Sequence, residues 1–205
     1  MRKALLTVRV GPEAEQLAQY SWPTFWRYAC EHGYSVIEQR FPLDARPPSW
    51  SKLPAMLELW GGWDTIVCID IDAMIVQFDR DYFQEVLNLT DAAVGFAVEG
   101  FSRAPNCGMW IVRGKDHRSY DFLNTVNKMD RFYNDAVFEQ AAVHYLLGYD
   151  PGIPSAVHSR NTVLLPPEYN DCCFLCPRPI VKHWAGQRHH DRLAGMSQTL
   201  RELGL

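Results

Sequence analysis

Two aspartates one residue apart, Asp70 and Asp72, follow an apolar run at residues 65–69. The run is rich in β-branched residues and too short to cross a membrane, so it predicts a strand buried on both faces. Ionised carboxylates beside a packed core are costly unless a cation compensates them. Ligands bind at the carboxyl ends of strands in open α/β sheets, and alternate strand residues face the same side. The pair therefore predicts a site for one hard cation with oxygen ligands, although Asp-x-Asp also marks many solvated strand ends.

Strand and helix patterns alternate on both sides of this motif. Residues 4–10 and 34–41 have the composition of strands, and residues 13–32 between them have helical spacing with an expected break at Pro23. This opening is typical of doubly wound α/β domains. Further strands are predicted at residues 92–98, 107–112, 163–170 and 180–186, and further helices at 50–60, 81–89, 116–129, 135–147 and 190–203.

The composition indicates a soluble globular protein. The 205 residues are enough for one domain with a sizeable core, and we expect that single domain to span residues 1–205. Hydrophobic residues make up 47% of the chain and charged residues 21%, which is ordinary for this class. A net charge of −4 gives no global attraction to nucleic acid or anionic lipid. No segment has the pattern of a signal peptide or membrane span, so we expect a cytoplasmic protein.

Six cysteines without an export signal favour reduced thiols. Three of them, Cys172, Cys173 and Cys176, are close enough in sequence to suggest zinc. A four-thiolate site needs a second pair at matching spacing, and the chain has none. The sequence therefore favours buried thiols over a structural zinc site.

Four short motifs elsewhere add polar groups that could serve the same site. Lys52 lies on the predicted helix before the acid pair, Asn106 opens a predicted strand, and Glu139-Gln140 begins a predicted helix. His183 ends an apolar strand, with a glycine three residues later. Neutral imidazole is a common metal ligand, and an asparagine offers both a donor and an acceptor to a hydroxyl-rich ligand. Singly, each has an ordinary interpretation as a helix face, a turn or a hydrogen-bonded histidine, but their order is more specific.

In that order, the motifs Asp-x-Asp, Asn-x-Gly, Glu-Gln and His-x-x-Gly resemble those of nucleotide-sugar glycosyltransferases of the GT-A fold. The chain is similar to retaining enzymes such as glycogenin and the bacterial lipopolysaccharide galactosyltransferases, and to α-galactosyl, mannosyl and xylosyl transferases, over about residues 4–190. The resemblance implies a Rossmann-like α/β domain with a mixed, mostly parallel sheet flanked by helices. It also implies metal-dependent transfer of a sugar from a nucleotide diphosphate sugar, by preference a UDP-sugar, with retention of configuration.

The resemblance further implies a role for each matching residue. Asp70, Asp72 and His183 would hold Mn²⁺ or Mg²⁺ on the donor diphosphate. A second set would ease the positive charge that develops at the anomeric carbon: Gln140, Glu139 and Glu99. A third set would bind the donor: Thr7, Val8, Arg9, Lys52, Asn106, Gly186, Arg188 and His189.

The chain departs from the family pattern after His-x-x-Gly. Many relatives carry Lys-Pro-Trp there, with the lysine on the β-phosphate, whereas this chain has Gln187-Arg188-His189. Arg188 and His189 are therefore expected to take the role of that lysine. The membrane anchor and stem of the eukaryotic relatives have no counterpart, which favours a bacterial or viral origin.

Two other functions fit part of the pattern. A phosphatase of the haloacid dehalogenase type also places Asp-x-Asp after an apolar strand, but normally on the first strand and with Thr or Val where this chain has Met74. A nucleotide-sugar or carbohydrate binding module without catalysis would keep the same fold. The presence of Asp70, Asp72 and His183 together argues against that alternative.

The sequence leaves the acceptor open among glycans, proteins and small molecules. A nucleic acid acceptor is possible but not favoured. The basic residues near the carboxyl end are explained more simply by binding of the donor phosphates and by a solvated helix start. They are Arg178, Lys182, Arg188 and Arg192.

Overall fold

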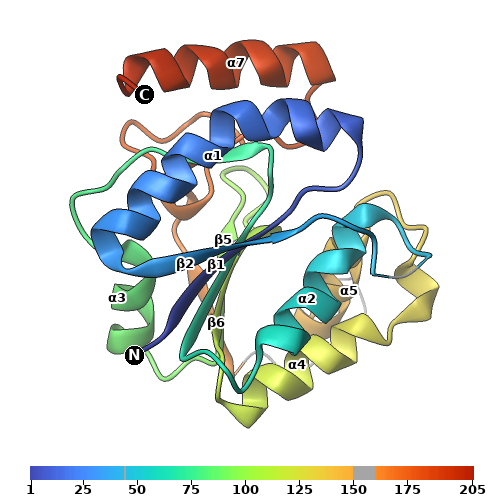
Figure 1. Cartoon of the computed structure of the whole chain (residues 1–205). Coiled ribbons are helices and arrows are strands. Elements are labelled where there is room, and N and C mark those ends of the chain that lie inside the picture. The colour runs from blue at the N-terminus through green and yellow to red at the C-terminus, as the bar shows by residue number, and fades with distance from the viewer. Residues whose placement is uncertain (44, 150–159) are drawn as a thin grey trace.

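The computed structural model of the protein describes residues 1–43, 45–149 and 160–205. Its main sheet has six strands in the order β2-β1-β3-β6-β5-β7 (Figure 1). Strand β6 runs antiparallel to both of its neighbours, and the other three pairs are parallel, which confirms the predicted mixed sheet. The strands are β1 Lys3–Val8, β2 Tyr34–Gln39, β3 Thr65–Ile69, β5 Val94–Val98, β6 Pro105–Arg113 and β7 Thr162–Leu165.

Helices cover both faces of this sheet. Helices α1, α3 and α7 lie on one face, and α2, α4 and α5 lie on the other (Figure 1). The α-helices are α1 Pro12–His32, α2 Lys52–Leu59, α3 Tyr82–Leu89, α4 His117–Asn127, α5 Glu139–Leu147 and α7 His189–Glu202. Short 3₁₀ helices are η1 Pro48–Ser51, η2 Asp130–Phe132 and η3 Pro167–Tyr169.

The central strand β3 is buried along its whole length, as its apolar run predicts. Its alternate side chains enter two separate cores because successive residues of a strand point to opposite faces. Val67 and Ile69 pack into the core under α1 and α3. Ile66 and Cys68 pack into the core under α2, α4 and α5. A strand covered by helices on both sides needs no polar alternation, which explains its continuous hydrophobicity.

A second, two-stranded sheet crosses the end of the first. Strand β4, Ala73–Ile75, pairs antiparallel with β8, Val181–His183, and Ala73 stands opposite His183. This pairing brings two segments that are more than a hundred residues apart in sequence to the carboxyl end of β3.

Most predicted elements are present with shifted ends, and β4 is a strand that the sequence pattern did not predict. Pro23 lies inside α1 and does not end it. The helix continues because it buries Phe25 and Tyr28 against the sheet, and such packing outweighs the cost of one proline, about 3 kcal/mol. The helix predicted from residue 135 begins only at Glu139, after turns that place Phe138 at a φ of 53°.

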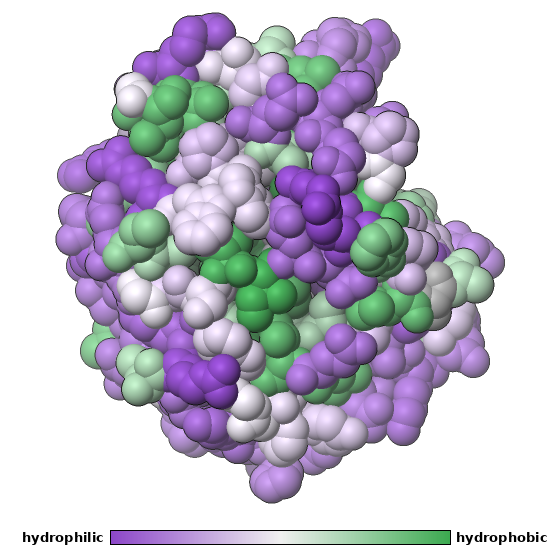
Figure 2. All heavy atoms as spheres, in the orientation of Figure 1, coloured by the Kyte–Doolittle hydropathy of each residue, from purple (hydrophilic) through white to green (hydrophobic). Residues whose placement is uncertain are grey.

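Most of the face shown in Figure 2 is hydrophilic, with an apolar patch near its middle, over the region where β2 forms the sheet edge. Val36 and Ile37 of β2 are half-buried against the two cores. No helix among the described residues is long and apolar enough to cross a membrane.

Asp81 ties three elements of the fold together. Its carboxylate accepts hydrogen bonds from Lys3 Nζ at 2.6 Å, from Tyr34 Oη at 2.8 Å and from Tyr28 Oη at 3.2 Å. It also caps α3 by accepting from the backbone N–H of Gln84. One carboxylate therefore satisfies donors from β1, β2 and α1 at the start of α3.

We predict that Asp81→Ala lowers the free energy of unfolding by about 2–4 kcal/mol, because it leaves buried donors and a lysine without their acceptor. Urea denaturation followed by circular dichroism measures the change. The matched control is Asp91→Ala, which removes an exposed carboxylate paired only with Arg118. Equal midpoints for the two variants would contradict the role assigned to Asp81.

Candidate active site

The two aspartates lie in a turn rather than on a strand. Strand β3 ends at Ile69, and residues 70–72 form the turn into β4. The N–H of Ala73 donates to the carbonyl of Asp70 at 3.1 Å, and the N–H of Trp184 donates to the carbonyl of Asp72 at 3.0 Å. The sequence argument relied on the alternation of a regular strand, which is wrong for these residues. The turn brings the carboxylates together instead.

His183 completes this cluster from β8. Ligand atoms of Asp70, Asp72 and His183 all lie within 4.8 Å of one another. His183 is 3% exposed, its Nε2 lies 3.2 Å from Asp72 Oδ1, and its Nδ1 is buried without a hydrogen-bond partner among the described residues. A Cβ at Gly108 would stand 2.1 Å from the ring Cε1, so only glycine leaves room for the imidazole. The cluster is thus built by three segments of the chain: the turn at residues 70–72, β6 and β8.

Lys52 is the buried cation beside Asp70. Its Nζ lies 2.7 Å from Asp70 Oδ1 and 2.8 Å from Glu139 Oε1, and it donates to the carbonyl of Cys107 at 3.1 Å. Burial lowers the pKa of Lys52, but the two carboxylates outweigh it and raise that pKa well above its usual value. Burial raises the pKa of Glu139, and Lys52 opposes that effect. The ammonium therefore stays charged and holds two acids in the site.

Asp72 has two cationic partners of its own. Arg192 Nη1 from α7 lies 3.3 Å from Asp72 Oδ2, on the opposite oxygen from the His183 contact. Burial raises the pKa of Asp72, but His183 and Arg192 outweigh it and hold that pKa below its usual value. Burial lowers the pKa of His183, and Asp72 and Asp70 together raise it above its usual value. Asp72 is consequently an anion at neutral pH.

Glu99, Asn106 and Gln140 form a second polar group. Glu99 Oε1 accepts from Asn106 Nδ2 at 3.2 Å and from Gln140 Nε2 at 3.4 Å. Gln140 Oε1 in turn accepts from the backbone N–H of Cys107 at 2.9 Å. The carboxylate therefore lies between two amides, which orient their NH₂ groups toward it. These three predicted residues come from the loop after β5, from β6 and from α5, and the fold brings them together.

Asn170 belongs to this group, and sequence reasoning missed it. The residue is fully buried, and its Nδ2 donates to Asn106 Oδ1 at 2.6 Å. That oxygen also accepts from the N–H of Gly108 at 2.8 Å. With its oxygen occupied twice, the Asn106 amide can only present its NH₂ group to Glu99. No local signal marks Asn170, because its role rests on a contact across 64 residues.

The acids lie at the junction of two hollows. The larger has a volume of about 660 Å³ and the smaller about 220 Å³, and both are lined by Ser49, Asp70, Asp72 and Arg192. The larger hollow contains the Glu99 group, Glu139 and His183. The smaller extends between β1 and α1, where Val8, Ala14 and Leu17 line it, with Lys52 at its inner end. The acid cluster thus faces both spaces.

Of the other residues predicted to bind the donor, some line the two hollows and others do not. Thr7 is buried, and its hydroxyl has no hydrogen-bond partner. Val8 lines the smaller hollow and Gly186 the larger. Arg9 lines neither, because it pairs with Glu38 at 2.8 Å and Glu15 at 3.3 Å.

Residues 188 and 189 stand at the start of α7. Arg188 is the residue that precedes the first turn of this helix. His189 Nε2 lies 2.7 Å from Gln16 Oε1 of α1, so this side chain is directed toward another helix. Neither residue lines the two hollows, and the arginine that contacts the acids is Arg192, one turn further along.

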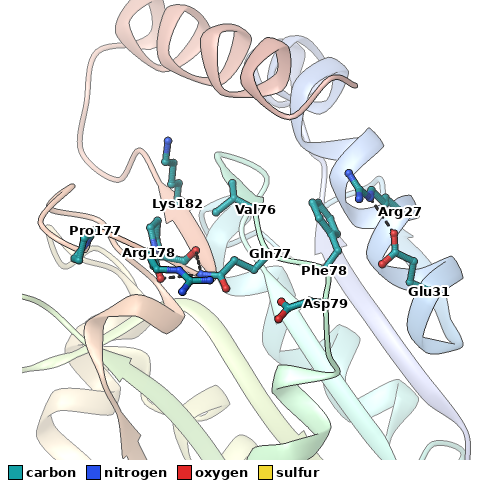
Figure 3. Close-up of a pocket in the computed structure, with 10 residues that line it drawn as sticks. Arg27, Glu31, Val76, Gln77, Phe78, Asp79, Pro177, Arg178 and Lys182 are labelled. Atoms are coloured by element: carbon teal, nitrogen blue, oxygen red, sulfur yellow. Dashed lines mark hydrogen bonds and ion pairs between the residues drawn. The ribbon is translucent and has the colours of Figure 1, made fainter.

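The basic residues singled out near the carboxyl end do not converge. Arg178 and Lys182 line a separate hollow of about 580 Å³, between α1 and the segment after β4 (Figure 3). Its charges are mixed, since Arg27 pairs with Glu31 at 2.9 Å and Asp79 lies on the same wall. Only Arg192 of that set contacts an acid of the candidate site.

Two of the three neighbouring cysteines line the larger hollow. Cys172 Sγ and Cys173 Sγ lie 3.8 Å apart. Burial, together with the neighbouring Cys173, raises the pKa of Cys172 to about 12, so this thiol is protonated and a poor nucleophile at neutral pH. Within the described part of the chain, the group with metal-ligand spacing is Asp70, Asp72 and His183 rather than the thiols.

The donor set suits a hard divalent cation. Two carboxylates and one imidazole are ligands that Mn²⁺ accepts, and Mg²⁺ prefers the oxygens. The buried His183 Nδ1 has no hydrogen-bond partner among the described residues, so this nitrogen is available as a metal ligand. The absence of a side chain at Gly108 leaves the space in which the ring lies. The residues present therefore fit the metal that the sequence predicted.

Comparison with solved structures identifies the fold. A glycosyltransferase involved in the glycosylation of the major capsid of PBCV-1 superposes with a TM-score of 0.73 at 15% identity, over 97% of this chain and 100% of that one. The galactosyltransferase LgtC, in complex with donor and acceptor sugar analogs, gives 0.58 at 12% identity, over 98% and 96%. Mouse xyloside xylosyltransferase 1 gives 0.58 at 10% identity, over 89% and 97%.

These likenesses establish that the chain has the GT-A fold, as the order of its motifs predicted. Neither protein-family models nor curated protein sequences match the chain. The acid pair follows the third strand of the chain, which also differs from the first-strand position expected of a haloacid dehalogenase phosphatase.

We predict that Lys52→Met destabilises the metal-free protein by about 3–5 kcal/mol near neutral pH, because Asp70 and Glu139 lose their buried cation. Without Lys52, the pKa of Glu139 rises further above its unfolded value. A raised carboxyl pKa costs stability as pH rises through it, so the deficit shrinks as pH falls from about 8 to about 5. Urea denaturation in EDTA across that range measures the effect, and a deficit independent of pH would contradict it.

Proposed function

We propose that the protein is a metal-dependent glycosyltransferase that moves a sugar from a nucleotide diphosphate sugar, by preference a UDP-sugar, to a hydroxyl acceptor with retention of configuration. The observation that carries this proposal is the convergence of Asp70, Asp72 and His183 at the end of β3 in a GT-A fold. Mn²⁺ or Mg²⁺ is the proposed cofactor.

The two hollows differ in their lining, and each suits a different part of the donor. The smaller one is lined by the apolar side chains of Val8, Val10, Ala14 and Leu17, which suit the flat face of a base. The larger one holds Glu99, Asn106 and Gln140, whose carboxylate and amides suit sugar hydroxyls. The acid cluster lies at their junction, where the diphosphate of such a donor would sit.

The proposed chemistry needs stabilisation of two opposite charges. A bound divalent cation supplies Lewis acidity that stabilises negative charge on the departing diphosphate. Arg192 and Lys52 form ion pairs with Asp72 and Asp70 and add positive charge to the same side. On the sugar side, Glu139, Glu99 and the Gln140 amide offer negative charge or lone pairs to the anomeric carbon, and Asn170 fixes Asn106 beside them.

We predict that Asp72→Ala abolishes Mn²⁺-dependent hydrolysis and transfer of the donor, because it removes a metal ligand and unpairs His183 and Arg192. A screen of nucleotide sugars by thermal shift, with and without Mn²⁺, first selects the donor. Turnover is then measured by release of the nucleotide, with circular dichroism as the test of folding. The matched control is Asp79→Ala, an acid in the separate hollow of Figure 3.

Undiminished turnover by Asp72→Ala would contradict the metal role. Tight, Mn²⁺-dependent donor binding without turnover by the wild type, across a panel of sugar, alcohol and protein acceptors and water, would instead indicate a binding module. The anomeric configuration of the product, read by NMR, tests retention.

We also predict that Gly108→Ala weakens Mn²⁺ binding by about 10–100-fold, because the new methyl group would displace the His183 ring. Isothermal titration with MnCl₂ measures the loss. Gly62→Ala is the control, since a Cβ there meets only Leu59 O at 3.5 Å and the residue lies in a turn away from the acids. An unchanged affinity in Gly108→Ala would remove His183 from the ligand set.

A further inference from the structure

The residues that line the larger hollow are of two chemical kinds. The first, which we call the floor, consists of the acids, the amide group and His183 described above. The second, which we call the apolar wall, consists of side chains that make weak hydrogen bonds or none: Ala136, Val137, Phe138, Cys172, Cys173 and Ala185. Only the floor can replace the hydrogen bonds that a sugar loses when it leaves water.

Apolar side chains continue from this wall onto the surface. Phe138, Phe174 and Val137 are 40%, 41% and 45% exposed, and Leu175 and Phe101 are 54% and 78% exposed. A Cβ at Gly100 would touch Leu175 Cδ1 at 3.1 Å and Cys173 Cβ at 3.7 Å, so the loop that carries Phe101 packs on the loop that carries Leu175. We call these five side chains the apolar mouth: Phe101, Val137, Phe138, Phe174 and Leu175.

The backbone at the mouth is strained. Among the residues that the structure describes, three non-glycine residues have positive φ: Arg103 at 60°, Phe138 at 53° and Phe174 at 56°. Each lies in a different loop bordering the larger hollow, namely residues 99–104, 135–138 and 172–175. Bulky side chains rarely adopt this conformation, and such strain persists mainly at ligand sites. The strain and the exposed apolar groups are independent observations that coincide at one place.

We propose that the apolar mouth is the acceptor subsite and that it binds a hydrocarbon aglycone, the alkyl chain attached beyond the acceptor's reacting hydroxyl. This inference rests on the proposed function and extends it to the class of acceptor. A second sugar placed against the mouth would lose hydrogen bonds to water without replacement, because its side chains offer none. A hydrocarbon chain gains free energy there by leaving water. Val137 and Phe138 of the mouth line the same hollow as the Glu99 group, and Cys173, which also lines it, stands beside the contact between Gly100 and Leu175. An acceptor hydroxyl placed at the Glu99 group would therefore leave its chain beside Phe101 and Leu175.

The test compares methyl and octyl glycosides of glucose, galactose, mannose and xylose, below the micelle concentration. Binding to the Mg²⁺-loaded protein with nucleoside diphosphate is measured by saturation-transfer NMR titration, which requires no turnover and no paramagnetic ion. We expect at least one octyl glycoside to bind about tenfold more tightly than its methyl partner, the gain from burying roughly two methylene groups. In Phe101→Ser/Leu175→Ser, that ratio should fall to nearly one.

The matched control is Phe41→Ser/Leu89→Ser, which removes one phenylalanine and one leucine that are 75% and 83% exposed and line neither hollow of the candidate site. The control should keep the wild-type ratio. Equal binding of every methyl and octyl pair by the wild type, or an equal loss in both double variants, would overturn the proposal.

Hydrolysis of the donor by the wild type, with water as acceptor, separates this inference from the proposed function. If hydrolysis occurs and the octyl glycosides gain nothing, the acceptor inference alone fails. If no nucleotide sugar is hydrolysed or transferred with Mn²⁺, the proposed function fails with it.

Discussion

The concentration of negative charge at the end of β3 is the constraint on which the rest of the site depends. Asp70, Asp72 and Glu139 lie beside a packed core, where uncompensated carboxylates would be costly. Lys52 pairs with the first and the third, and Arg192 and His183 pair with the second. Because every one of these acids has a cationic partner, the cost of holding them close together beside the core is offset. A divalent cation would bind to carboxylates that these ion pairs already hold in place.

The small sheet of β4 and β8 holds the acid pair and His183 close together. Its register places Ala73 opposite His183, so the turn that carries the aspartates is joined by backbone hydrogen bonds to the strand that carries the imidazole. Strand β6 then passes beside the ring with Gly108, the residue whose missing side chain leaves room for it. The antiparallel direction of β6 also brings Asn106 to the same edge as the carboxyl end of β3. A wholly parallel sheet would carry that residue to the opposite edge.

The site is asymmetric in its chemistry as well as its charge. Polar groups with fixed orientations cover the floor of the larger hollow, and the amide of Asn106 is held by Asn170 on one side and Glu99 on the other. The apolar wall has almost no hydrogen-bonding capacity, and most of its residues lie in loops that contain a non-glycine residue with positive φ. The GT-A fold, which solved structures at 10–15% identity share, carries in this chain both the acid cluster and a mouth made from the chain's own loops.

The sequence alone determined the strands of the main sheet, the acid pair, His183 and the amide-bearing motifs, because apolar periodicity and residue type are local properties. It did not predict β4, the three-residue strand that pairs with β8. It also led to the GT-A fold through the order of those motifs. Only the tertiary structure decided that Lys52 is a buried partner of Asp70 and Glu139 rather than a surface helix residue, and that Asn170 supports Asn106. It likewise directed Arg9 and His189 toward neighbouring side chains and brought Arg192 to Asp72. These outcomes depend on contacts between residues far apart in the chain, and a long side chain takes the nearest opposite charge or hydrogen-bond partner that the folded backbone offers.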